Sequence, residues 1–340
     1  MNLEEHLRNL RSSYAIGRVK PLVMLSDKDF QQSLDQEADL PLTPAEQAVF
    51  TKCAHFRVAA LKAAREGNLA IADYLFTSTE TLIESQDLSP VATLMMRSAH
   101  EAAVAYLDYR RQEYDSGTAR IYRALAIDES LENDYGYGHY HLHRLRLLLN
   151  LIRLKRRQGE IAEAFQMSVA IVDYMEQKRF SLPFPTTWDA HALSHLAVEP
   201  RNFLFEQALF EILFMVVGRE GDTEAMLQML NAHTCSVLSE QCYLSPRLHR
   251  WLESLQALQD QQIDRYCLLI QPLLAAGPND SLWLWYGLLL ELVQLCQKWE
   301  IGEAQMLGHE IMADMTSWQW SRLPPSWKRI SEQMMAYSHA

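Results

Sequence analysis

Glycine and proline are scarce in this chain, which holds only 12 of each among 340 residues. A protein built from short strands needs a turn roughly every ten residues and takes most of its turns from these two residue types. Stretches in which apolar and polar residues strictly alternate are also rare. Apolar residues still make up 49% of the sequence, which is enough for a large core. A large core with few turn residues and few alternating stretches predicts an all-α fold.

The cysteines form no recognisable motif. There are five, an odd number, and none belongs to a CxxC pair, which argues against a disulfide framework and against a zinc ribbon. The first residues, from Met1 to His6, also lack the basic and apolar regions of a secretory signal. We therefore expect reduced thiols and a cytoplasmic protein. The cysteines are Cys53, Cys235, Cys242, Cys267 and Cys296.

The sequence has no apolar run long enough for a membrane span. The two most apolar stretches, Phe203–Val217 and Leu282–Cys296, are each 15 residues long and both contain glutamate. A spanning helix needs about 20 predominantly apolar residues. We expect both stretches to be helices buried inside the protein, and we expect no membrane span.

Positive charge is also in deficit, because the formal net charge is −12. A chain of this charge lacks the general attraction to phosphate that nucleic-acid binding requires. The imbalance is uneven: residues 97–157 hold 11 Lys and Arg against 8 Asp and Glu, whereas residues 186–316 hold 6 against 17. We expect another protein or a peptide as the partner, and these two regions of opposite charge offer a route to a homo-oligomer.

What the chain does have is a repeated turn between amphipathic segments. Each turn begins with a small or aromatic residue, which is followed directly by an acid or Asn. Ala comes five positions after the first residue of the turn, as in Gly67 to Ala72 and Gly159 to Ala164. Gly stops a helix and Ala lets the next helix approach closely, so the pattern predicts antiparallel helical hairpins. Two further turns have this form: Gly221, with Ala225 one place early, and Trp299, with Ala304.

Start signals complete the helix prediction. Thr43-Pro44 and Ser89-Pro90 each place a capping residue before a proline at the first helical position. The prolines at 183 and 185 break the pattern in the middle of the chain. The predicted helices are 3–10, 44–66, 69–85, 90–113, 118–131, 139–158, 161–178, 201–220, 223–239, 246–258, 263–275, 282–298, 301–315 and 322–337.

These helices suggest a division of the chain into lobes. The spacing between turns is 39 to 62 residues, a size that fits two helices per repeat. We predict about six hairpins in a superhelical array. The predicted parts are an N-terminal helix and irregular segment (1–42), a lobe of three hairpins (43–180), a proline-containing linker (181–200) and a second lobe with a C-terminal capping helix (201–340).

Two of the turns resemble those of the tetratricopeptide and related helical-repeat superfamily. They are Gln158-Gly159-Glu160-Ile161-Ala162-Glu163-Ala164-Phe165 and Glu66-Gly67-Asn68-Leu69-Ala70-Ile71-Ala72. The resemblance implies an α-solenoid that binds a protein or peptide on a concave face. We expect an adaptor, a regulator or a chaperone that holds a partner peptide or helix in this concave groove, without a cofactor.

Arginine and tyrosine supply the candidate binding residues. The 139–158 helix is predicted to bury leucines on one side and to carry a stripe of arginines on the other. Two alternatives to partner binding stay open. The arginine stripe can instead neutralise acids on a neighbouring helix or on a second subunit, and the tyrosines that precede this helix in the sequence can instead belong to the core. The candidate partner-binding residues are Arg110, Arg111, Tyr114, Arg146 and Arg153.

Two other functions stay open. His139 and His143 are four residues apart on one predicted helix face, a spacing that suits two ligands of one metal ion in a metal-dependent helical enzyme. No HExxH, nucleophile elbow or phosphate loop accompanies them, so we expect a protein that is not an enzyme. The remaining alternative is a receptor for a small signalling peptide or ligand.

Overall fold

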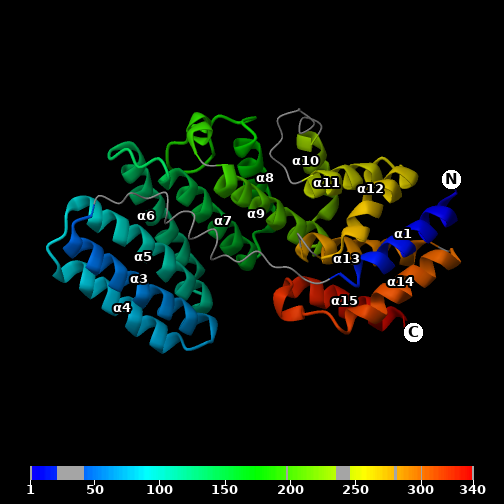
Figure 1. Cartoon of the computed structure of the whole chain (residues 1–340), viewed down its shortest axis with the longest axis horizontal. Coiled ribbons are helices and arrows are strands. Elements are labelled where there is room, and N and C mark those ends of the chain that lie inside the picture. Colours follow the sequence, from blue (N-terminus) through cyan, green and yellow to red (C-terminus); the bar gives the residue numbers. More distant parts are fainter. Residues whose placement is uncertain are drawn as a thin grey trace. The chain divides into compact units, whose positions relative to one another are not determined.

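The computed structural model describes residues 2–20, 42–196, 198–234, 246–278, 282–299 and 301–338. All regular structure in these ranges is helical (Figure 1), and they contain no strand. The prediction of an all-α fold is confirmed. Cys235 and Cys242, the acid-rich residues 26–39 and most of the predicted turn at 277–281 lie outside the described ranges.

The chain forms two compact units. The contiguous unit, Lys28–Phe205, contains six α-helices and the 3₁₀ helix η1 among its described residues. In these helices, most residues on the inward faces are alanine, leucine or other apolar residues. The elements are α3 (Pro44–Arg65), α4 (Leu69–Ser85), α5 (Pro90–Arg111), α6 (Tyr114–Asn133), α7 (Tyr140–Gln158), α8 (Ile161–Met175) and η1 (Ala190–His195).

The composite unit joins Met1–Asp27 to Glu206–Ala340. The boundary between the units falls within helix α9 (Val198–Val217). The other elements of the composite unit are α1 (Leu3–Gly17), α10 (Thr223–Thr234), α11 (Pro246–Gln259), α12 (Ile263–Ala276), α13 (Leu282–Lys298), α14 (Gly302–Met315), η2 (Trp320–Arg322) and α15 (Pro325–Ser338).

The predicted start signals form the expected caps. The Thr43 hydroxyl accepts from the backbone N–H of Glu46, and the Glu46 carboxylate accepts from the backbone N–H of Thr43 at 2.8 Å. The same carboxylate accepts from the backbone N–H of Ser89 at 2.8 Å. Glu46 thus fixes the beginning of α3 to the beginning of α5, a contact between successive hairpins.

The turns also show why the spacing of alanine matters. Gly67 and Gly159 adopt the left-handed conformation, with φ of +86° and +87°, and Ala72 and Ala164 after them are buried. Gly221 is left-handed too, but Ala225 is exposed and Met226 is buried in its place. The expectation for Ala225 was wrong because a shift of one residue rotates a side chain by about 100° around a helix.

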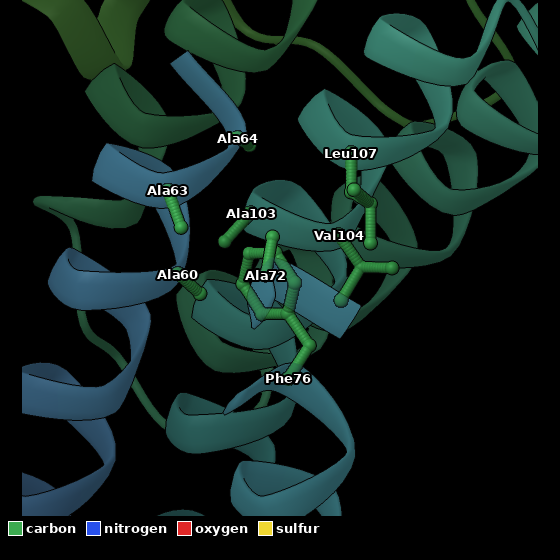
Figure 2. Packing of buried hydrophobic residues seen from close by; sticks show 8 residues of the cluster. All are labelled: Ala60, Ala63, Ala64, Ala72, Phe76, Ala103, Val104 and Leu107. Carbon is green, nitrogen blue, oxygen red and sulfur yellow. The ribbon is translucent and has the colours of Figure 1, made fainter. Parts of the chain in front are cut away.

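Small side chains bring α3, α4 and α5 close together. Figure 2 shows the cluster, in which five alanines from the three helices surround Phe76. Helices with Ala at the contact can approach more closely than helices with larger residues. The cluster comprises Ala60, Ala63, Ala64, Ala72, Phe76, Ala103, Val104 and Leu107.

Helix α1 is part of the composite unit, where it packs against α12 and α14 (Figure 1). The sequence pattern predicts instead a separate N-terminal segment, residues 1–42. Arg11 pairs with Glu310 on α14, and Asp314 accepts from the hydroxyl of Tyr14 and from Arg18, the latter at 3.0 Å. The apolar residues Leu7, Leu10 and Tyr14 are buried under these pairs.

Tryptophan fills much of the core of the composite unit. Trp251 and Trp327 are fully buried, and Phe214 lies edge-on to Trp327. Gly287 leaves room for the Trp327 ring, since a Cβ at this position would lie 2.9 Å from it. The two apolar stretches are buried in α9 and α13, as predicted. No helix in the described ranges is long and apolar enough to cross a membrane.

Candidate functional site

Three of the predicted binding residues come together at one end of the α5–α6 hairpin. Tyr106, Tyr109 and Tyr114 form a row of rings, with neighbouring centroids 5.7 Å and 6.4 Å apart. Arg110 lies beside this row and donates to the hydroxyl of Tyr106 at 3.4 Å. We call these four residues, together with Arg111, the Tyr–Arg cluster.

The arginines of the Tyr–Arg cluster are held by their neighbours. Arg110 donates to the backbone carbonyl of Arg65 at 3.1 Å, which ties α5 to the end of α3. Arg111 pairs with Asp73 of α4 at 3.1 Å. All members of the cluster are partly exposed. The cluster is therefore a surface feature with restricted side chains.

The other two predicted residues lie on α7. Arg146 and Arg153 are half-buried and share one stripe with Asn150, whose Oδ1 accepts from Arg153 at 3.2 Å. The leucines of α7 are buried on the opposite side, as the pattern predicted. Both arginines also interact with other groups of the protein. Their role as partner contacts stays a prediction.

The two histidines of the metal hypothesis have different surroundings. The ring of His139 lies 4.6 Å from that of Tyr140, and burial lowers the pKa of its imidazole. The Nδ1 of His143 is 2.7 Å from the carboxylate of Asp128, which also accepts from the hydroxyl of Ser98. Within the described ranges, no group of three or more His, Cys, Asp or Glu is arranged to hold a metal ion.

The structure contains a buried polar network that the sequence pattern does not predict. Nδ1 of His141 is 2.8 Å from a carboxylate oxygen of Glu132, and its Nε2 is 2.9 Å from the hydroxyl of Tyr174. The other Glu132 oxygen accepts from Arg144 at 2.6 Å. Because an ionised carboxylate can only accept, Nδ1 of His141 donates to Glu132.

The same network holds the segment after the prolines. Arg144 donates to the backbone carbonyl of Thr187 and lies over the Trp188 ring, with its guanidinium carbon 4.1 Å from the ring centroid. Glu129 on α6 accepts from the backbone N–H of Thr187 at 2.6 Å. The irregular residues before η1 are thereby anchored to α6 and α7.

The surroundings of Glu132 and Arg144 in the network favour the ionised form of both side chains. Burial by itself raises the pKa of Glu132, but the hydrogen bond from His141 and the charge of Arg144 outweigh it, so the pKa lies below the ordinary value. Burial raises the pKa of Tyr174. Arg144 is 1% exposed and His141 is fully buried, so the protein encloses both side chains. The geometry is that of an anchor between helices.

One feature of the sequence could have pointed to this network. Arg144 lies among leucines on the face of α7 that the pattern assigns to the core. A charged residue on a buried face needs a buried partner of opposite charge. The partner Glu132 and the cover Trp188 are 12 and 44 positions away, however, and periodicity alone does not pair such distant residues.

Comparison with models of protein families, with curated proteins and with solved structures found no match for this chain.

Proposed function

We propose that this chain is a cytoplasmic helical-repeat protein that binds a partner protein or peptide and catalyses no reaction. In this proposal the hairpins of α3 to α8 stack as a solenoid similar to the tetratricopeptide arrays, and their exposed side receives the partner. The observation that carries the proposal is the Tyr–Arg cluster at the end of the α5–α6 hairpin.

Tyrosine and arginine are the residue types on which protein interfaces most often depend. Each offers a large contact area and directional hydrogen bonds. In the Tyr–Arg cluster the rings contact one another, and both arginines are already held, by Arg65 and by Asp73. A partner that binds there has little side-chain freedom to restrict, which favours affinity.

The surroundings suggest the chemistry of the partner. The partly exposed tyrosine rings of the cluster contribute apolar area to this surface. The arginines of the cluster still have N–H groups that can donate to a carboxylate. We infer that the partner segment combines acidic residues with apolar side chains, in a helix or an extended peptide.

Charge reversal tests this proposal. The variant Arg110→Glu with Arg111→Glu should reduce co-purification of the partner from the native host at least tenfold, because it replaces both donors with acceptors. Arg97→Glu is the matched control, since Arg97 lies on the same helix, is exposed and forms one ion pair at 3.5 Å. Recovery of the same partners by both variants in equal yield would show that the cluster is not the binding surface.

A second pair of variants tests the prediction for α7. Reversal of Arg146 and Arg153 should weaken the same interaction if the stripe contributes to the surface. The circular dichroism spectrum and the melting temperature separate this effect from misfolding, because both arginines are half-buried. If the partner is a second copy of the chain, the same variants will lower the mass measured by light scattering.

A further inference from the structure

The composite unit contains a cavity of about 260 Å³ that the Tyr–Arg cluster does not involve. It lies among α9, α10, α11 and α13, and apolar side chains form much of its wall, among them Val216, Leu227, Leu255 and Leu295. A water molecule occupies about 30 Å³ of liquid volume. The cavity is therefore large enough for a small organic molecule.

Two residues of the wall each have a buried acceptor oxygen without a hydrogen bond. Oε2 of Glu291 and Oε1 of Gln259 are buried, and neither has a hydrogen-bond partner among the residues that the structure describes. Leaving such groups buried and unpaired is unfavourable, most of all for a carboxylate. A ligand that supplies N–H donors would satisfy these oxygens.

Positive charge occupies another part of the wall. Arg219 and Lys298 line the cavity and are exposed, and Arg219 donates to Gln294. Glu291 and Lys298 are seven residues apart on α13 and lie on the same helix face. At a rise of 1.5 Å per residue, this spacing is about 10 Å along the helix.

We propose that this cavity binds a small zwitterion whose ammonium and carboxylate groups are separated by an apolar spacer. The ammonium donates to Glu291 and Gln259, the spacer packs against the apolar wall, and the carboxylate lies near Lys298 and Arg219. The acid Glu291, the apolar Leu295 and the cation Lys298 follow one another along α13 in the same order as the three parts of such a ligand.

A metal ion fits the cavity less well than a zwitterion does. Glu291 is its one acidic residue, and no group of three or more metal-ligating side chains occurs in the described ranges. A purely apolar ligand would leave Oε2 of Glu291 and Oε1 of Gln259 without a hydrogen bond. A fatty acid would bring a second carboxylate or leave the acceptors unpaired.

The protonation of Glu291 gives the proposal a distinctive signature. Burial raises the pKa of this carboxyl to about 7, and the nearby indole of Trp251 opposes the rise. Tyr266 faces the carboxyl from α12 and stays neutral, because burial raises its pKa well above the ordinary value. A bound ammonium favours the ionised carboxylate, so binding at pH 6 should release about one proton per ligand.

Titration calorimetry with 8-aminooctanoate tests the assignment, with octylammonium and octanoate as probes that each lack one charge. The full-length wild-type protein should bind 8-aminooctanoate at least tenfold more tightly than either probe. Measured at pH 6 in buffers of different ionisation enthalpy, the heat should reveal proton release. Failure of wild-type protein to bind 8-aminooctanoate, or tighter binding of either probe, overturns the proposal.

Variants locate the site. Glu291→Gln should weaken binding of 8-aminooctanoate at least tenfold and abolish proton release, whereas Glu224→Gln, the same change at an exposed position on α10, should alter neither. Lys298 is exposed, so Lys298→Ala should not affect folding. This variant should bind 8-aminooctanoate several-fold more weakly than the wild type and should bind octylammonium with unchanged affinity. Equal affinity of Glu291→Gln and wild-type protein, or of Lys298→Ala and wild-type protein, contradicts the assignment.

Discussion

Replacement of Glu291 by Gln should stabilise the composite unit, and by an amount that depends on pH. Glu291 lines the cavity with one carboxylate oxygen buried and unpaired. Gln has nearly the same shape but cannot ionise, so it removes the cost of a buried negative charge. The expected gain in the free energy of unfolding is therefore small at a pH where wild-type Glu291 is protonated in both the folded and the unfolded protein. It is large at a pH where Glu291 must ionise in the folded protein.

The pKa gives the size and the pH range of this gain. Burial raises the pKa of Glu291 from 4.5 to about 7 in the folded protein. Between these values the folded state binds more protons than the unfolded state, so the stability of the wild type falls as pH rises. Each pKa unit corresponds to 1.36 kcal/mol. From pH 4.5 to pH 8, the stability of Glu291→Gln relative to wild type should rise by about 3 kcal/mol.

Urea unfolding followed by tryptophan fluorescence measures this difference. Seven of the eight tryptophans belong to the composite unit, so the signal reports mainly on that unit. The comparison between two pH values cancels any constant effect of the Gln side chain. Glu224→Gln should show no pH-dependent gain, because Glu224 is exposed. A relative stability of Glu291→Gln that is the same at pH 4.5 and pH 8 would refute the reasoning.

Two further predictions concern other close contacts. Gly17→Ala should destabilise the composite unit by about 3 kcal/mol, because the new Cβ would lie 1.9 Å from the backbone oxygen of Leu274. Gly302 has open space around it, so Gly302→Ala should reduce stability far less in the same urea experiment. Arg144→Met should cost about 3–5 kcal/mol, since it leaves Glu132 buried without its cation. It should also speed proteolysis of residues 181–187, whereas Arg157→Met, exposed on the same helix, should do neither. Unchanged cleavage rates in Arg144→Met would contradict the anchoring role of the network.

Local signals predicted much of the fold. Thr43 and Ser89 mark helix starts by chemistry that acts within four residues, and Gly67 and Gly159 mark turns by the same short range. The helices they delimit agree with the structure to within a few residues. Where a prediction used position on a helix face, as for Ala225, an offset of one residue was enough to make it wrong.

Contacts between distant residues were not predictable in this way. The sequence shows that Arg144 lies on the apolar side of its helix, but not that Glu132 and Trp188 enclose it. The cavity around Glu291 likewise depends on four helices separated by up to 82 positions, between Val216 and Lys298. Periodicity describes one helix at a time, and these sites depend on how several helices pack.

The place of α1 in the composite unit has a consequence for synthesis of the chain. Its partners on α12 and α14 follow it by about 250 to 300 residues, which a ribosome adding about 5–20 residues per second needs roughly 13–60 s to make. The contiguous unit is translated in full during that interval. Leu7, Leu10 and Tyr14 stay without their native partners throughout it, so the nascent protein carries an uncovered amphipathic helix that a chaperone can hold until translation nears residue 315.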